Sequence, residues 1–422
     1  MPIRRSFLTV SLVISFAITA AAGGKAEELA RQAVAEDKAA AGAAAAELRR
    51  MGQKGLDALF TVHSDQIAQY KLSGKTTGEW RRIAAAIDTV AMQKDAYASG
   101  LFWFTDLVQA KKSANARNKP ILSLRLLGNL NEEFSCANSR LFRSLLYANS
   151  EIAGYLRENY VLHWLSVRPA PRITVDFGDG RRIERTVTGN SIHYILHEDG
   201  TIIDALPGLY SPRAFKLYLE QAHDVYKRVD ELNRHPRNLA LARFRSMNAD
   251  HLMETRKKAF ELAKVSLADP VTGRDALSVA PMAMTKMVTE VSLLRVYDPQ
   301  AQFIPSLNFD DWKRLSRLYE PDATIDEASV AFIRRQNPDL TDQELQALIK
   351  NLNEYVSLDT TRNDFLFRVQ IYSILNGEFE QDVEAVNDSI YTNVFKTPAA
   401  DQWLGLYSSD VYMALDGQGV TR

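Results

Sequence analysis

The apolar pattern between residues 121 and 205 constrains the fold more than any other feature of this 422-residue chain. Residues 121–127 form a short, mostly apolar run that predicts a buried strand, and residues 160–167 predict a second one. A helix beginning at Cys136 is expected between them. Strand, helix and strand in this order imply a right-handed crossover between parallel strands. The middle of the chain is therefore expected to fold as an α/β domain.

Two turn signals extend this domain with antiparallel strands. Gly178-Asp179-Gly180 separates one pair of strand-like runs, and Glu198-Asp199-Gly200 separates another. Ser211-Pro212 then predicts the start of a closing helix. Antiparallel hairpins added to a parallel pair predict a mixed sheet.

Helices are expected on both sides of this domain. Residues 25–51 are rich in Ala, Glu and Lys and contain no Pro, which predicts one long helix. Beyond residue 236, capping boxes at Thr324 and Thr341 precede apolar residues at helical spacing, so this region is predicted to be all-helical.

One further helix is expected to start at Asp359 or Thr360. Such a helix start would explain why the polar Asn363 and Asp364 stand in an apolar neighbourhood. The whole chain is then divided into four parts: a signal peptide at 1–22, an N-terminal helical region at 23–98, the α/β domain at 99–235 and a C-terminal helical domain at 236–422.

The N-terminus has the pattern of an export signal. Arg4 and Arg5 precede an apolar run at 7–20, and Ala20-Ala21-Ala22 fits a cleavage site before Gly23. The paired arginines also fit the twin-arginine motif, so both the Sec and the twin-arginine routes stay open. A periplasmic or extracellular location is expected. No later run reaches about 18 apolar residues, so no membrane span is expected after signal removal.

The net charge and the cysteine content limit the classes of function to be considered. The net charge of -1 gives no electrostatic reason to expect nucleic-acid binding. Cys136 is the single cysteine, so no intramolecular disulfide can form. A thiol at a helix N-terminus meets unpaired N–H groups, which favour the thiolate. Cys136 is therefore a candidate nucleophile, and a packed structural cysteine is the alternative.

The order of helix, strand, cysteine-bearing helix, strand, hairpin and closing helix resembles secreted bacterial thioredoxin-like proteins over roughly residues 101–222. The quoted pieces that carry this resemblance are WFTDLVQAKKSANARNKPILSL, the Cys136 helix, EIAGYLRENYVLHWLSV and ILHEDGTIIDALPGL. The resemblance implies a thioredoxin-like fold and a thiol site at Cys136, with protein or small-molecule thiols as partners.

Two departures from that family affect the implied site. The motif is Cys136-Ala137-Asn138-Ser139, so a hydroxyl at Ser139 replaces the second thiol, as in monothiol variants. The family places a cis-proline opposite the cysteine, at the backbone that docks the substrate. The matching place here is Asn190-Ser191-Ile192, which has no proline. Arg140 and Arg143 are further candidates, for contact with a thiolate or an anion, and a solvated helix face is the alternative.

No metal or other cofactor is predicted. His193 and His197 are four residues apart, but in a strand four residues span roughly 13 Å, too far for joint chelation. Two functions remain. One is monothiol thiol–disulfide exchange or redox sensing through Cys136. The other is a non-enzymatic scaffold with a redox-inactive thioredoxin fold, whose helical flanks bind an unknown protein partner.

Overall fold

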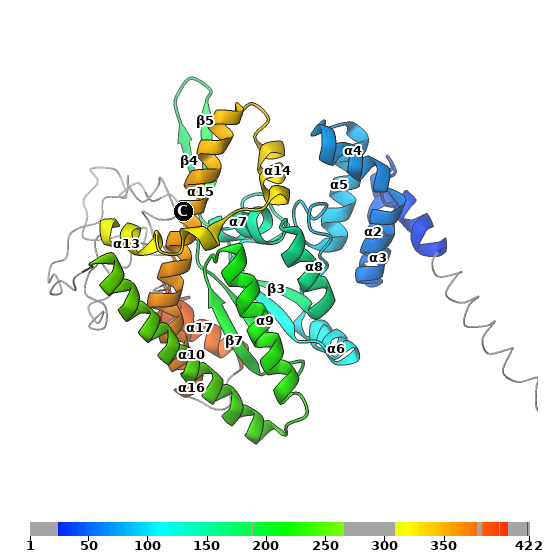
Figure 1. Ribbon diagram of the computed structural model, residues 1–422. Coiled ribbons are helices and arrows are strands. Elements are labelled where there is room, and N and C mark those ends of the chain that lie inside the picture. The colour runs from blue at the N-terminus through cyan, green and yellow to red at the C-terminus, as the bar shows by residue number, and fades with distance from the viewer. Residues whose placement is uncertain are drawn as a thin grey trace, which may run out of the picture.

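The computed structural model describes residues 24–186, 189–265, 309–377, 382–395, 397–403 and 420 (Figure 1). The expected signal peptide at 1–22 lies outside these residues. Within them, a mixed sheet is combined with many helices, which confirms the expected α/β plus helical architecture. No helix among the described residues is long and apolar enough to cross a bilayer.

The central sheet has five strands in the order β1-β3-β2-β6-β7. β3 pairs in parallel with both β1 and β2, whereas β6 is antiparallel to β2 and to β7. Both predicted parallel strands and the last hairpin are confirmed. The strands are β1 (Trp103–Phe104), β2 (Ile121–Leu127), β3 (Val161–Arg168), β6 (Ser191–Leu196) and β7 (Ile202–Pro207).

β2 is buried along its whole length because it lies in the centre of this sheet and is covered on both faces. Asp106 caps the helix that leads to it, and Asn149 and Ser211 cap two later helices with their side-chain oxygens. The helices of this part are α6 (Leu107–Arg117), α7 (Ala137–Leu141), the π-helical turn η1 (Phe142–Leu146), α8 (Ser150–Asn159) and α9 (Pro212–Val229).

The first predicted hairpin forms a separate two-stranded sheet from β4 (Arg172–Asp176) and β5 (Arg182–Thr186). It projects at the top of the molecule in Figure 1. Val175 faces Ile183 across the hairpin, and both side chains are exposed, as is Phe177 beside them.

The N-terminal helices form a second apolar core. The long helix predicted at 25–51 is wrong, because the chain turns after residue 32 and Asp37 caps a new helix by accepting hydrogen bonds from Ala39 and Ala40. After the helical residues 24–32, these helices are α2 (Lys38–Arg50), α3 (Gln53–Val62), α4 (Ser64–Ser73) and α5 (Gly78–Ala91).

The described C-terminal region is helical and shares one apolar core with the sheet. Arg245 on α10 donates hydrogen bonds to the carbonyl groups of Ile202 and Ile203 on β7, which ties the two parts together. The elements are α10 (Arg234–Ala263), α13 (Phe309–Ser316), η2 (Glu320–Ala323), α14 (Glu327–Gln336), α15 (Asp342–Arg362), η3 (Asn363–Arg368), α16 (Val369–Gly377) and α17 (Val383–Asn393).

No helix starts at Asp359 or Thr360, so that prediction is wrong. α15 runs through both residues and continues directly into the π-helical segment η3. Asn363 and Asp364 therefore lie inside a continuous helical stretch. They are buried against the central sheet region, where Asn363 donates a hydrogen bond to the carbonyl oxygen of Leu209 at 2.7 Å.

Candidate functional site around Cys136

Cys136 lies between β2 and α7, where the sequence predicted it. It is the N-cap residue of α7, a helix of only five residues. Its backbone N–H donates to the carbonyl of Leu127 at 3.0 Å, which holds the loop against the end of β2. Its side chain has no exposed surface. A reagent in solution therefore has no direct access to the thiol in this conformation.

The Ser139 hydroxyl forms hydrogen bonds with Ser135 and with the backbone of Cys136 rather than with the thiol. It donates to the hydroxyl of Ser135 at 2.5 Å and lies 2.9 Å from the backbone carbonyl of Cys136. Both contacts stabilise the turn before α7. The side chain of Ser139 is as fully buried as that of Cys136.

Two arginines lie on the same helical stretch as the thiol. Arg140 donates to the hydroxyl of Thr186 at 2.9 Å, and Arg143 is buried with its Nη1 3.8 Å from Asp95. Burial lowers the pKa of both guanidinium groups, and the charge of a Cys136 thiolate would raise it. Of the two predicted arginines, Arg143 is the more deeply buried, so it does not lie on a solvated helix face.

The predicted docking backbone is adjacent to this site. Asn138, two residues after Cys136, donates to the carbonyl of Gly189 and to the hydroxyl of Ser191 at 2.8 Å. Ile192 is buried in β6, opposite Arg125 on β2 and Pro207 on β7. The structure thus brings Asn190, Ser191 and Ile192 to the cysteine loop, without a cis peptide bond among the described residues.

The C-terminal segment contacts this docking backbone. The Asn190 side chain donates to the hydroxyl of Thr397 at 3.0 Å, and the Tyr391 hydroxyl donates to the Asn190 carbonyl at 3.2 Å. Arg168 at the end of β3 donates to the carbonyls of Thr397, Pro398 and Asp401 at 2.7, 3.3 and 3.2 Å. The C-terminal segment therefore occupies hydrogen-bonding groups of Asn190 and of Arg168 at the end of β3.

Sequence reasoning missed a buried polar network on β2. Arg125 is fully buried and forms a two-point contact with Glu384 of α17, at 2.5 and 3.3 Å. It also donates to Ser123 at 2.6 Å, and Ser123 lies 2.8 Å from Nδ1 of His163. Burial, together with the charge of Arg125, lowers the pKa of His163 to about 3. The signal available in the sequence was Arg125, a charged residue inside the apolar run 121–127.

A second missed network lies where η3 meets β7. Arg368 and Asp204 form an ion pair at 2.7 Å, with both side chains about 1% exposed. The guanidinium of Arg368 stacks on the ring of Tyr218 at 3.8 Å, and Tyr218 donates to Asp364 at 2.6 Å. Burial raises the pKa of Asp364. π-Helical turns often mark functional sites, but here the turn places a buried arginine against the sheet.

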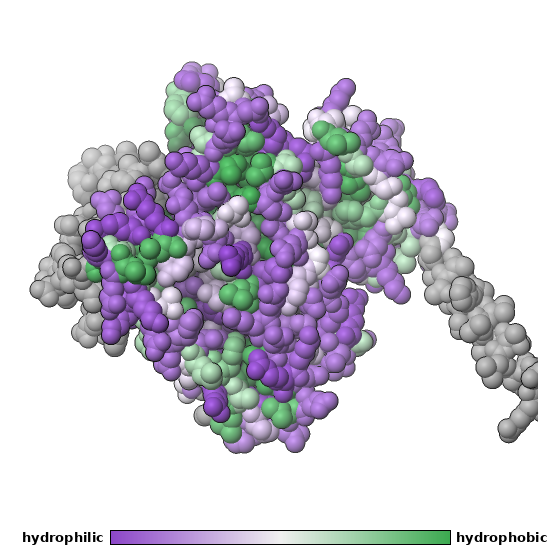
Figure 2. Space-filling model, in the orientation of Figure 1, coloured by the Kyte–Doolittle hydropathy of each residue, from purple (hydrophilic) through white to green (hydrophobic). Residues whose placement is uncertain are grey.

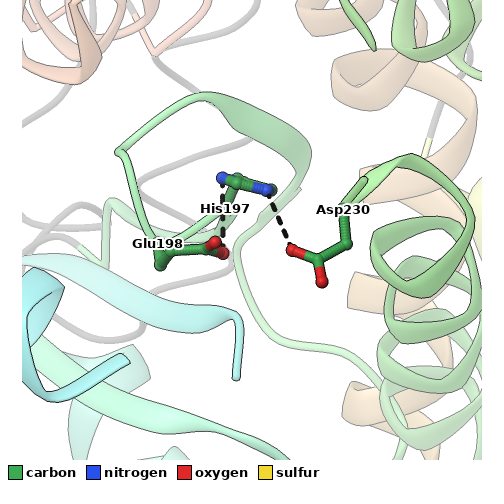
Figure 3. A group of neighbouring side chains, drawn as sticks. All are labelled: His197, Glu198 and Asp230. Carbon is green, nitrogen blue, oxygen red and sulfur yellow. Dashed lines mark ion pairs between the residues drawn. The ribbon is translucent and has the colours of Figure 1, made fainter. Parts of the chain in front are cut away.

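The two histidines of β6 and its following turn have different surroundings. His193 is fully buried and lies 2.7 Å from the hydroxyl of Tyr147. Burial lowers its pKa to about 3, so it is neutral at physiological pH. His197 instead lies among acidic side chains, with Glu198 and Asp230 on opposite sides of the ring (Figure 3). Among the described residues, these three are the group with donor atoms arranged for a metal ion.

Comparison with protein-family models, curated proteins and solved structures found no match for this chain.

Proposed function

We propose that this chain is an exported interaction protein in which a redox-silent thioredoxin-like domain serves as a scaffold. The strand order β1-β3-β2-β6-β7, with a cysteine at the start of the first helix after β2, supports the thioredoxin-like assignment. The helical flanks and the projecting hairpin then supply surface for a protein partner. This is the second of the two functions expected from the sequence.

One observation carries the proposal: the thiol is buried, and the protein's own C-terminal segment is hydrogen-bonded to Asn190 of the predicted docking backbone. Cys136 has no exposed surface, and Asn190 is bonded to Tyr391 and Thr397 of the C-terminal segment. Thiol–disulfide exchange requires a thiolate to reach the sulfur of a substrate. A fold that covers both the thiol and the docking backbone favours a scaffold over an exchange enzyme.

The β4–β5 hairpin offers the contact surface. One of its faces carries Val175 and Ile183, which are 43% and 42% exposed, and Phe177 beside them is 51% exposed. Its other face is polar and closed by ion pairs such as Arg182–Asp176 at 2.9 Å. Figure 2 shows hydrophobic colour among hydrophilic surface in the region of this hairpin, at the top of the view. Exposed apolar faces of this kind often mark protein contacts.

Alkylation of the folded mature protein tests the redox-silent part. We expect a small thiol reagent to leave Cys136 unmodified from pH 6 to 9 and to label it fully in denaturant, as measured by mass spectrometry. Rapid labelling of the folded protein at pH 7 would contradict the proposal and favour monothiol chemistry.

Crosslinking from the hairpin tests the scaffold part. A photoreactive amino acid at Val175 should yield a discrete crosslinked species in exporting cells, because this side chain lies on the apolar face. The same amino acid at Thr174, on the polar face, is the matched control and should yield none. Equal crosslinking from both positions, or none from Val175, would argue against the hairpin as the contact surface.

A further inference from the structure

The turn between β6 and β7 meets the end of α9 in a cluster of acidic side chains around one imidazole. His197 is 3% exposed, and its Nδ1 lies 3.3 Å from Glu198 Oε2 while its Nε2 lies 3.4 Å from Asp230 Oδ1. One donor atom from each of the three side chains lies within 4.8 Å of the other two. In Figure 3 the two carboxylates point at the ring from the β6–β7 turn and from the end of α9.

The cluster holds more negative charge than its surroundings favour. Asp230 directly follows the last residue of α9, where the helix dipole makes a carboxylate unfavourable. Glu198 Oε2 is buried and accepts no hydrogen bond from the described residues. The Tyr226 hydroxyl lies beside both carboxylates and donates to Asn118 at 3.0 Å. A bound cation would stabilise the two carboxylates that lie within 3.4 Å of this ring.

We propose that His197, Glu198 and Asp230 form a binding site for a divalent transition-metal ion of the Zn²⁺ or Mn²⁺ class. One imidazole and two carboxylates suit these ions, whereas Mg²⁺ and Ca²⁺ prefer oxygen ligands throughout. Three protein ligands leave a fourth position for water in a tetrahedral zinc site.

His197 Nε2 is the ring nitrogen that binds the metal. Asp230 already lies 3.4 Å from it, close to the spacing of about 3.4 Å between ligands in a tetrahedron with bonds of about 2.1 Å. Nδ1 lies 3.2 Å from Asp199 Oδ1, which can accept its N–H. Metal-bound imidazoles commonly donate their second N–H to a carboxylate in this way. The Glu198 carboxylate lies at Nδ1, so binding of the metal at Nε2 requires this side chain to rotate.

Arg237 is the intrachain competitor for this position. Its Nη1 lies 3.0 Å from His197 Nε2, and its Nη2 is paired with Asp199. Metal binding requires the guanidinium to leave the imidazole, and its ion pair with Asp199 can remain. Removing this guanidinium should therefore strengthen metal binding, which a purely structural ion-pair cluster would not predict.

Equilibrium dialysis of the mature, chelator-treated protein against Zn²⁺ tests the site, with elemental analysis as the readout. The wild type should bind one ion per chain at pH 7.5. His197→Gln and Asp230→Asn should each weaken binding by more than the roughly 10- to 100-fold that loss of an outer-shell partner costs. Arg237→Gln should tighten it. Asp230 is partly exposed, so Asp230→Asn serves if His197→Gln fails to fold by circular dichroism.

His251→Gln is the matched control, because His251 is an exposed histidine on α10 outside the cluster. It should bind Zn²⁺ as the wild type does, and Mg²⁺ should not compete. Absence of stoichiometric binding would overturn the proposal. So would equal binding by the wild type and Asp230→Asn, since the ion would then be held by other surface groups.

Discussion

Acid should destabilise this protein through His193, and the size of the effect follows from its burial. The unperturbed imidazole has a pKa near 6.5, whereas burial lowers the pKa of His193 to about 3. Below pH 6.5 the unfolded chain takes up a proton that the folded chain refuses. Stability is therefore fully present above pH 6.5 and is lost as the pH falls toward 3.

The magnitude at pH 5 is about 2 kcal/mol. Each pH unit below the unfolded pKa removes about 1.36 kcal/mol, and pH 5 lies about 1.5 units below it. His163 has the same lowered pKa of about 3 and should contribute a similar loss. From these two side chains, the wild type should lose about 4 kcal/mol of unfolding free energy between pH 7.5 and pH 5.

His193→Gln isolates one of the two contributions. Glutamine can still hydrogen-bond the hydroxyl of Tyr147, but it does not titrate. Urea unfolding of wild type and variant at pH 7.5 and pH 5.0 gives four free energies. The variant is expected to be less stable at pH 7.5 because packing is lost, yet its decrease on going to pH 5 should be smaller by about 2 kcal/mol.

The control for this test is a histidine that is exposed in the folded protein. His251→Gln, at an exposed position on α10, should leave the pH dependence of the wild type unchanged. If His193→Gln shows the same decrease as the wild type, His193 does not remain neutral in the folded state. The burial argument would then be wrong for this site.

Three further predictions test other parts of the structure. Arg368→Met should lower the unfolding free energy by about 3–5 kcal/mol in urea unfolding, because it leaves Asp204 buried without its partner. Arg213→Ala breaks an exposed ion pair with Asp322 and should lower it by at most about 1 kcal/mol. Similar losses in the two variants would show that burial does not decide the cost. Ser139→Cys should allow a disulfide with Cys136 across one turn of helix. Mass spectrometry after oxidation should detect it as a loss of about 2 Da that a reductant reverses. Free thiols that persist after oxidation would show that the geometry forbids the bond. Exported protein should begin near Gly23 by N-terminal sequencing, and soluble protein that keeps Met1 would contradict the signal assignment.

Local sequence signals predicted the elements of the sheet well. The run at 121–127 gave β2 at its observed bounds, because a short apolar segment between Pro120 and Gly128 has few alternatives. The Ser211-Pro212 cap gave the start of α9 for the same reason. These signals depend on residues close together in the chain, so they can be read before any tertiary structure is known.

Errors arose where a local signal was overlooked or was overridden by packing. Asp37 was an available cap signal inside the long Ala-rich stretch, and it starts α2 as a separate helix. Asp359 is a residue type that often caps helices, but it lies within α15, because the helix continues through the π-helical segment η3 into α16. That turn places Arg368 opposite Asp204, a pairing that spans 164 residues and leaves no local trace.

The candidate site also depends on contacts between residues far apart in the chain, which local sequence signals do not predict. The family resemblance predicted that Cys136 and Ser139 lie close to the backbone at 190–192, and in the structure they are adjacent. What the sequence could not supply was the hydrogen bonding of Asn190 by Thr397 and Tyr391, since both are about 200 residues away in the chain.

The same C-terminal segment links three strands of the sheet by polar contacts. Arg125 on β2 is bonded to Glu384, Tyr194 on β6 donates to Asn387 at 3.2 Å, and Arg168 on β3 is bonded to three carbonyls after α17. Because Arg125 is fully buried, detaching α17 would leave a charge in the core without its partner, which is strongly unfavourable. The contacts between the C-terminal segment and Asn190 are thus supported by the core of the sheet. Cys136 belongs to the same apolar core and has no exposed surface, so a reagent could reach its thiol only if part of that core opened, and this favours a structural role for Cys136.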